Sequence, residues 1–218
     1  MYNTVLFDLD GTLTDSAPGI INSIKYALNK LNIEVNEKTL NNFIGPPLVK
    51  SFAKYYGMNE EESRNAVDIY REYFADKGMF ENSVYPGIED SLKKLKEAGK
   101  QLMVCTAKPE VFAVQILKHF HLDSYFDYIG GSLMDETRTS KYEVMEYLIQ
   151  LCQLDVKHTV MIGDRADDIN AAKKARMDCI GVFYGYGSPV ELTTAGAKFF
   201  CGNPASLADV ILEFDTIK

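Results

Sequence analysis

Short runs of almost uninterrupted apolar residues recur along the chain. Strands that are apolar at nearly every position are typical of a parallel sheet whose two faces are both covered. The runs that predict such strands are residues 4–9, 102–106, 158–162 and 179–183, with weaker candidates at 128–129 and 198–201. We therefore expect a buried, mainly parallel sheet.

Amphipathic segments with helical spacing alternate with these runs. Gly99 and Pro109 lie at segment boundaries, where glycine commonly ends a helix and proline commonly begins one. The predicted helices are residues 88–98, 110–119, 140–150, 167–175 and 204–213. This alternation of strand and helix predicts an α/β core with a doubly wound, Rossmann-like parallel sheet.

Residues 16–82 break the alternation. In the first part of this segment, apolar residues such as Ile20, Ile24 and Leu28 recur at helical spacing, and no run in the segment predicts a buried strand. The predicted helices of the segment are residues 18–31, 37–43, 48–56 and 60–80. We predict that residues 16–82 form an inserted all-helical domain and that residues 1–15 and 83–218 form the α/β core.

Composition narrows the classes of protein that fit. Of the 218 residues, 46% are hydrophobic, so the chain can bury a substantial core. The 31 acidic and 23 basic residues give a formal net charge of −8, which argues against binding a nucleic acid polymer or an anionic membrane, and at first sight against an anionic substrate. No apolar stretch approaches the roughly 18 residues that span a bilayer.

The first residues of the chain and the pattern of cysteines indicate which cellular compartment to expect. The first ten residues contain no basic residue but include Asp8 and Asp10, which is not typical of a signal peptide. The four cysteines are scattered without a C-x-x-C pair, which indicates free thiols in a reducing compartment. We therefore expect a cytoplasmic protein.

Carboxylate, hydroxyl and ammonium side chains lie at or just after the ends of the predicted strands at 4–9, 102–106 and 158–162. A lysine also begins the helix that precedes the strand at 158–162. In open α/β sheets the carboxyl ends of parallel strands meet at one edge, where ligands bind. The segments expected at this edge are Asp8-Leu9-Asp10-Gly11-Thr12, Thr106-Ala107-Lys108, Gly163-Asp164-Arg165-Ala166-Asp167-Asp168 and the helix start at Lys141. Several acids, one lysine and one hydroxyl are therefore expected to converge, although they lie far apart in sequence.

This set of side chains favours phosphoryl chemistry. Crowded carboxylates repel each other unless a cation joins them, and their hard oxygens suit Mg²⁺, which can neutralise phosphate oxygens during in-line attack. Asp8 is placed to attack phosphorus and form an aspartyl-phosphate. Asp10 could protonate the leaving oxygen and then deprotonate the attacking water. Thr106 and Lys141 would hold the phosphoryl oxygens, and Gly11 would allow a close approach of the backbone.

These residues also carry a family resemblance that covers nearly the whole chain. The stretch Asp8-Leu9-Asp10-Gly11-Thr12-Leu13-Thr14-Asp15-Ser16 resembles the first motif of the haloacid dehalogenase-like phosphohydrolases. The matches to the second, third and fourth motifs are Thr106, Lys141 and Gly163-Asp164-x-x-x-Asp168. The segments Phe43-Ile44-Gly45-Pro46-Pro47-Leu48 and Gly185-Tyr186-Gly187 look like the phosphoglycolate phosphatase branch and its relatives described as 5′-nucleotidases.

The resemblance implies a ligand set and a lid. It implies Mg²⁺ held by Asp8, by the backbone carbonyl of Asp10 and by Asp164, with Asp168 completing the metal shell or orienting Lys141. It also implies that the helical domain is a cap that closes over small substrates. Asp167 is a neighbouring acid that the sequence leaves as an alternative to Asp168. The candidate substrate-binding residues are Gly11, Thr12, Thr106, Ala107, Lys108, Lys141 and Arg165 in the core, and Gly45 and Lys50 in the cap.

The expected function is Mg²⁺-dependent hydrolysis of a small phosphomonoester, of the phosphoglycolate or nucleoside 5′-monophosphate type, through an aspartyl-phosphate. The partner would be a small phosphorylated metabolite, and the protein would be a monomer or a homodimer. One position departs from the family pattern, because many relatives read Thr-Asn-Lys where this chain has Thr106-Ala107-Lys108, and the contact made by that amide is missing.

Other functions fit part of the pattern. A phosphomutase of the β-phosphoglucomutase type would use the same Asp8 and Asp10. A dehalogenase is disfavoured because Asp10 as acid and base marks phosphoryl chemistry in the family. A receiver-like phosphoacceptor domain is disfavoured because the candidate nucleophile lies on the first strand and is followed by a helical insertion of about 65 residues. A non-catalytic binding protein is disfavoured because every catalytic position is filled.

Overall fold

The computed structural model describes residues 1–135, 137–197 and 199–217, and the chain divides into two compact units. Unit 1 consists of Met1–Thr14 and Val84–Lys218, and unit 2 consists of Asp15–Ser83. These borders lie one residue from the predicted ones. At the borders, strands β2 (Thr14–Asp15) and β3 (Ser83–Val84) form a separate two-stranded sheet.

Unit 1 is built on a six-stranded sheet in the order β5-β4-β1-β6-β7-β8, and every neighbouring pair is parallel. The strands are β1 (Thr4–Phe7), β4 (Gln101–Pro109), β5 (Tyr128–Ser132), β6 (Thr159–Gly163), β7 (Asp178–Val182) and β8 (Phe199–Cys201). The chain leaves β1 toward β4 and β5 and then continues on the other side of β1 with β6. The order therefore reverses beside β1, and such a reversal is where doubly wound sheets bind ligands.

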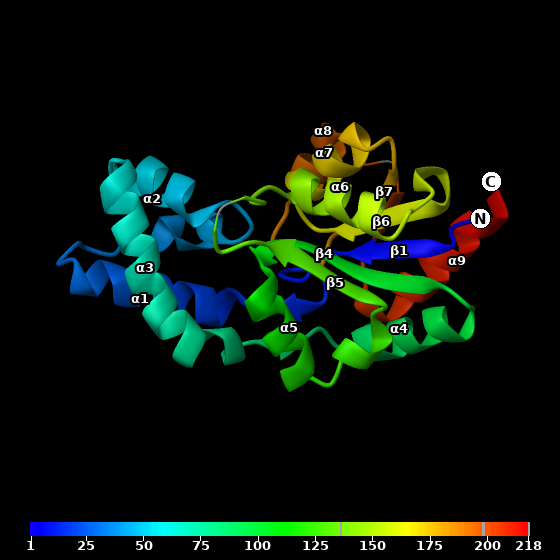
Figure 1. The fold of residues 1–218 in the computed structure, drawn as a ribbon, viewed down its shortest axis with the longest axis horizontal. Coiled ribbons are helices and arrows are strands. Elements are labelled where there is room, and N and C mark those ends of the chain that lie inside the picture. The colour runs from blue at the N-terminus through cyan, green and yellow to red at the C-terminus, as the bar shows by residue number, and fades with distance from the viewer. Residues whose placement is uncertain (136, 198, 218) are drawn as a thin grey trace. The chain divides into compact units, whose positions relative to one another are not determined.

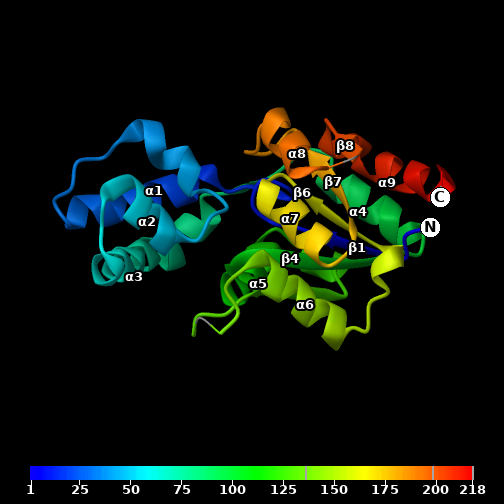
Figure 2. The same ribbon diagram turned by 90° about the horizontal axis from the view of Figure 1, so that it is seen from above.

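Helices cover both faces of this sheet (Figure 1). One face carries α6 (Lys141–Leu151), α7 (Ala166–Lys174) and α8 (Pro189–Ala195), which Figure 2 shows side by side across the strands. The other face carries α4 (Ile88–Glu97), α5 (Glu110–His119) and α9 (Leu207–Ile217). The doubly wound parallel sheet predicted from the apolar runs is therefore confirmed.

Alternate side chains of the strands fill the two halves of the core. Leu6, Met103 and Met161 lie in a cluster with α6 and α7 residues such as Val144. Their strand neighbours, including Val5, Val104 and Val160, are also buried, and they point to the opposite face because side chains alternate along a strand. Burial on both faces explains why these strands are apolar at nearly every position.

Local sequence signals determine several helix ends. Ser140 and Glu143 form a capping box at the start of α6, in which each side chain accepts a hydrogen bond from the backbone of the other. Gly87 (φ 92°) precedes α4 and Gly99 (φ 75°) follows it, and both adopt the left-handed conformation that glycine tolerates best. The capping box determines where α6 begins and so makes Lys141 its first residue.

Some elements of unit 1 differ from the prediction. Strand β1 ends at Phe7, whereas β4 continues to Pro109 with an irregular register between Cys105 and Pro109. Helix α8 was not predicted, because its seven residues are too few to show a helical repeat. The strand expected at 198–201 is present as β8 from Phe199, and its first expected residue, Lys198, lies outside the described residues.

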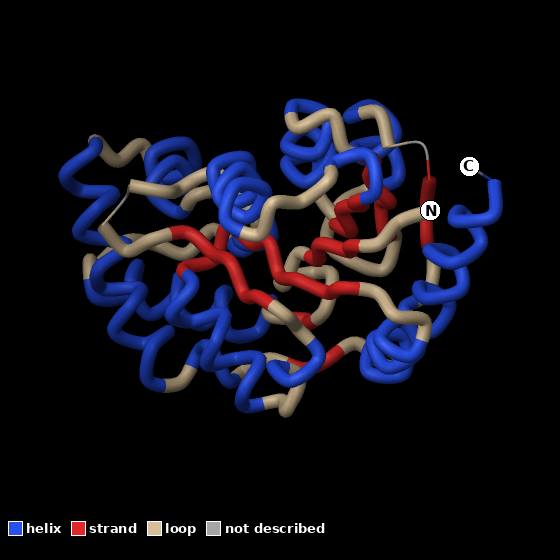
Figure 3. Tube along the Cα trace, turned by 45° about the vertical axis from the view of Figure 1, so that its right-hand side comes forward, coloured by secondary structure: helices blue, strands red, loops and turns tan. Residues whose placement is uncertain are grey.

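Unit 2 is helical, and Figure 3 shows its helices joined by loops. Its helices are α1 (Ala17–Lys30), α2 (Leu48–Tyr56), α3 (Glu60–Asp76) and two 3₁₀ helices, Glu37–Phe43 and Gly78–Phe80. The expected α-helix at 37–43 is thus a 3₁₀ helix, and the one expected at 60–80 ends at Asp76. Phe43 packs against Phe52 and Tyr56 in the unit's own core.

No helix in the described part of the chain is both long and apolar enough to cross a membrane.

Candidate active site

The candidate site residues predicted in the α/β core gather where the strands of unit 1 have their carboxyl ends. Asp8 directly follows β1, Asp164 directly follows β6, and Lys141 is the first residue of α6. Thr106 lies in β4, just past its last regular pair with β5 at Cys105. Strand β1 lies between β4 and β6, so these three strands bring their ends to one place.

Three buried carboxylates form the centre of the site. Asp8, Asp164 and Asp168 each offer one oxygen, and these oxygens lie within 4.8 Å of one another. Lys141 is buried beside them, with Nζ 2.6 Å from Asp8 Oδ1 and 2.8 Å from Asp168 Oδ1. The neighbouring Asp167 is exposed, so of the two acids at the start of α7 only Asp168 joins this group.

The ionisation of these groups reflects burial and mutual repulsion. Burial raises the pKa of Asp8 to about 6, because the attraction of Lys141 does not outweigh it and Asp168 adds repulsion. Burial and the charges of Asp168 and Asp8 also raise the pKa of Asp164 well above its usual value. Burial opposes the charge on Lys141, but the two carboxylates beside it raise its pKa. The three carboxylates therefore outnumber the one ammonium group that contacts them.

Asp164 is held by a loop that follows β7. The backbone N–H of Tyr186 donates to Asp164 Oδ2 at 2.7 Å, and the Thr12 hydroxyl lies 3.4 Å from Oδ1. A Cβ on Gly187 would lie 1.8 Å from the Asp164 carbonyl oxygen, and one on Gly11 would lie 2.3 Å from Asp164 Oδ2. Glycine is therefore required where these segments pack around the carboxylate.

Asp10 lies outside the group of three carboxylates and has a different partner. Its Oδ2 is 3.0 Å from Lys108 Nζ, and its buried Oδ1 has no hydrogen-bond partner among the described residues. The Lys108 backbone N–H donates to Thr106 Oγ1 at 3.2 Å. Lys108 therefore connects Asp10 of the first predicted motif with Thr106 of the second. Ala107 lies between Thr106 and Lys108 in the chain.

Arg165 is paired with a residue that sequence reasoning missed. Its Nε donates to Glu191 Oε1 at 2.9 Å, and the same oxygen accepts the Ala166 N–H at 2.9 Å. The Arg165 N–H also donates to Asp168 Oδ2 at 3.0 Å. Glu191 lies on α8 and Tyr186 on the loop before it; the only signal for this region was the Gly185-Tyr186-Gly187 segment.

The two candidates in the inserted domain belong to unit 2. Gly45 has a positive φ of 102° and follows the 3₁₀ helix Glu37–Phe43, and Lys50 is an exposed residue of α2. Their role in substrate binding remains a prediction.

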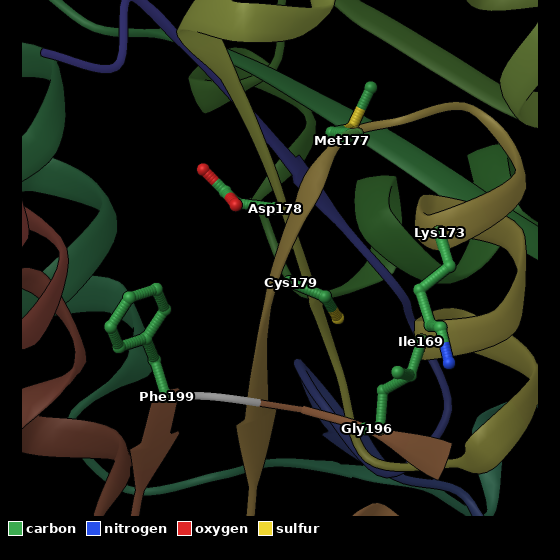
Figure 4. Close-up of a pocket in the computed structure, with 7 residues that line it drawn as sticks. All are labelled: Ile169, Lys173, Met177, Asp178, Cys179, Gly196 and Phe199. Atoms are coloured by element: carbon green, nitrogen blue, oxygen red, sulfur yellow. The ribbon is translucent and has the colours of Figure 1, made fainter.

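A separate small cavity of about 100 Å³ lies at the opposite edge of the sheet (Figure 4). Its lining includes Met177 and Asp178 at the amino end of β7, and Lys173 of α7. The cavity has room for a few water molecules. It is thus distinct from the carboxylate centre.

Known proteins resemble the chain along nearly its full length. The family model described as haloacid dehalogenase-like hydrolase matches residues 5–182. A 5′-nucleotidase of Pseudomonas aeruginosa is 43% identical over 211 residues, which cover 96% of each chain. A phosphoglycolate phosphatase of Vibrio parahaemolyticus is 26% identical over 217 residues, covering 95% of each chain.

A solved structure agrees with this assignment. The crystal structure of a predicted phosphatase from Clostridium acetobutylicum has a TM-score of 0.94 and 50% identity, and the match covers 98% of this chain and 99% of that one. The family match extends over most of the chain and includes the segments that supply Asp8, Thr106, Lys141 and Asp164. The chain therefore belongs to the haloacid dehalogenase-like hydrolases and is an enzyme of their phosphatase group.

Proposed function

We propose that the protein is a Mg²⁺-dependent phosphomonoesterase that uses Asp8 as its nucleophile. The observation that carries this proposal is the buried group of Asp8, Asp164 and Asp168, held together by Lys141 at the carboxyl edge of the sheet. The arrangement concentrates charge and fixed donors where a phosphoryl group would be transferred.

The residues fit a magnesium ion. Three carboxylates share a buried space with one ammonium group, and burial and mutual repulsion raise the pKa values of Asp8 and Asp164. All the offered ligand atoms are oxygens, which suit Mg²⁺ better than softer metals. Asp8, Asp164 and the backbone carbonyl of Asp10 would hold the ion. When bound, it would neutralise charge on the transferring phosphoryl group.

Two steps complete the reaction. An oxygen of Asp8 attacks phosphorus, the bond from phosphorus to the ester oxygen breaks with its electron pair going to that oxygen, and Asp10 supplies the proton. In the second step Asp10 takes a proton from water, whose oxygen attacks phosphorus and releases Asp8 and inorganic phosphate. Lys141 and the Leu9 N–H hold Asp8 Oδ1 at 2.6 Å and 2.7 Å, which fixes the carboxylate for attack.

The substrate class proposed first is a nucleoside 5′-monophosphate. The support is the 5′-nucleotidase name of a relative that is 43% identical over 96% of both chains. Phosphoglycolate ranks second, because the relative of that name is 26% identical. We propose that unit 2 acts as the cap, with Gly45 and Lys50 contributing to selection of the substrate.

The test compares wild type with Asp8→Asn in phosphate release from 4-nitrophenyl phosphate, with Asp167→Asn as a matched control on an exposed acid. Asp8→Asn should abolish release and Asp167→Asn should retain it. Persistent activity in Asp8→Asn would refute the mechanism. A panel of nucleoside monophosphates, phosphoglycolate and hexose 1-phosphates then identifies the substrate, and isomerised hexose phosphate without phosphate release would assign a mutase instead.

A further inference from the structure

Lys108 makes two contacts to catalytic groups. Its Nζ lies 3.0 Å from Asp10 Oδ2, and its backbone N–H donates to Thr106 Oγ1 at 3.2 Å. The Lys108 side chain is 5% exposed and that of Asp10 is 13% exposed, so water screens this ion pair poorly. A charged pair in such a position is a stronger constraint on geometry than a surface pair.

The irregularity of β4 makes this arrangement possible. The strand pairs regularly with β5 up to Cys105 and resumes only at Pro109. Within this interval the Lys108 N–H donates to the hydroxyl of Thr106. The interruption thus places the lysine at the sheet edge that carries Asp10, on the strand adjacent to β1.

The two oxygens of Asp10 have different environments. Oδ2 is held by Lys108, whereas Oδ1 is buried and has no hydrogen-bond partner among the described residues. A buried carboxylate oxygen without a donor is costly unless a ligand completes it. Oδ1 is therefore the atom suited to exchange a proton with the leaving oxygen and with water, while Oδ2 serves as the anchor.

We propose that Lys108 is a positioning residue that holds the Asp10 carboxylate for proton transfer, instead of a residue that binds the substrate. This inference rests on the proposed role of Asp10 as acid and base. Loss of the ammonium group frees Asp10 to rotate, so the step that needs a proton slows. Substrate binding depends on other groups and is affected much less, and attack by Asp8 on an ester whose leaving group needs no proton is spared.

Leaving-group dependence tests the proposal. An alkyl phosphate such as glycerol 2-phosphate needs its leaving alkoxide protonated, whereas 4-nitrophenyl phosphate releases a stable phenolate. The constant kcat/KM reports the step that forms the aspartyl-phosphate, in which the leaving group departs. Because acid catalysis contributes about 10²–10⁴-fold, Lys108→Met should lower kcat/KM for the alkyl ester at least about tenfold more than for the aryl ester.

Further variants control for charge and folding. Lys108→Arg keeps a cation and should recover part of the selective loss. Lys96→Met removes the lysine of an exposed pair, in which Nζ lies 3.0 Å from Asp127 Oδ2, and should change neither substrate. Lys108→Gln replaces Lys108→Met if the latter fails to fold by circular dichroism. An equal loss for both esters, or a rise in KM alone, would overturn the proposal and assign Lys108 to substrate binding.

Asp10→Asn separates this proposal from the proposed function. If Asp10 is the acid, Asp10→Asn alone lowers the alkyl rate selectively, and adding Lys108→Met to it produces no further selectivity. If Asp10→Asn shows no selectivity, the proposed function fails at Asp10. If Asp10→Asn is selective and Lys108→Met is not, only the positioning role fails. A crystal structure of Lys108→Met supplies a readout independent of activity, and an unmoved Asp10 carboxylate would contradict the proposal.

Discussion

Gly163 packs directly against the side chain of Asp168, so replacing Gly163 by alanine tests the geometry of the site. A Cβ on Gly163 would lie 2.2 Å from Asp168 Cγ and 2.3 Å from Asp168 Oδ2. An ordinary contact begins at 3.4 Å, so Asp168 would have to move by about 1.2 Å. This movement would strain its contacts with Lys141 Nζ at 2.8 Å and with the Arg165 N–H at 3.0 Å.

The expected cost has two parts. Forcing extra volume into a packed site costs about 1–3 kcal/mol. Weakening a charge-assisted hydrogen bond in a buried place adds about 1.5–3 kcal/mol, and part of this is recovered as the site relaxes. We expect Gly163→Ala to lower the free energy of unfolding by about 2–4 kcal/mol. Activity should fall about 10²-fold, since a displacement near 1 Å can cost that much in catalysis.

Gly181 offers a matched control. It pairs with Gly163 in the neighbouring strand, and a Cβ there would meet Leu192 and Phe200 side-chain atoms at 3.3 Å. The neighbouring side chains would have to give by only about 0.1 Å, so Gly181→Ala should cost about 1 kcal/mol or less, at the low end of overpacking effects. The measurements are urea unfolding followed by circular dichroism, and hydrolysis of 4-nitrophenyl phosphate. Equal stability and activity in the two variants would refute the view that Gly163 determines where Asp168 lies.

Three further predictions concern the metal, unit 2 and acid stability. Mg²⁺ at 100 times its dissociation constant should stabilise wild type by about 2.7 kcal/mol in thermal unfolding; Asp164→Asn should show no such shift, and an equal shift would argue against its role as a ligand. Gly19→Ala places a Cβ 1.8 Å from the Gly78 carbonyl oxygen and should cost about 1–3 kcal/mol in urea unfolding; an unchanged midpoint would contradict this packing. Backbone N–H groups of Ser140 and Thr139 lower the pKa of Glu143 from 4.5 to about 2. The ionised Glu143 carboxylate therefore stabilises the fold fully above pH 4.5, and this stabilisation is lost as the pH falls toward 2. The difference in unfolding free energy between wild type and Glu143→Ala should shrink over that pH range, and a constant difference would show that the carboxylate's charge does not stabilise the fold.

The sheet and the position of its acids could be predicted because they depend on rules that act locally. Nearly continuous apolar runs follow from burial on both faces, and the parallel order then brings Asp8 and Asp164 to one edge. Lys141 was expected there because it begins the helix that precedes β6, and it lies between Asp8 and Asp168. The family assignment made from these residues is confirmed.

Other features depend on long-range packing that no local pattern reports. Glu191 holds Arg165, but it lies on a seven-residue helix whose periodicity is too short to recognise. The pairing of Lys108 with Asp10 depends on an interruption in the pairing of β4 with β5. The polar and proline residues at the end of β4 do not read as part of a strand, so the sequence does not reveal this interruption. The segment at 37–43 has helical spacing, yet hydrophobic periodicity does not separate a 3₁₀ helix from an α-helix over two turns.

The charges of the site explain how an acidic chain can accept a phosphate. The two core lysines expected to receive the substrate, Lys108 and Lys141, are already engaged, since each ammonium group lies within 3.0 Å of a carboxylate. The ionisable groups around the carboxylate centre include Asp8, Asp10, Asp164, Asp168, Lys108 and Lys141, and Arg165 nearby is balanced by Glu191. Carboxylates therefore outnumber ammonium groups at this edge, which favours binding of a cation. If the proposed function holds, attraction of the phosphate would depend on a divalent cation at this edge, and the net charge of −8 over the whole chain would have little influence there.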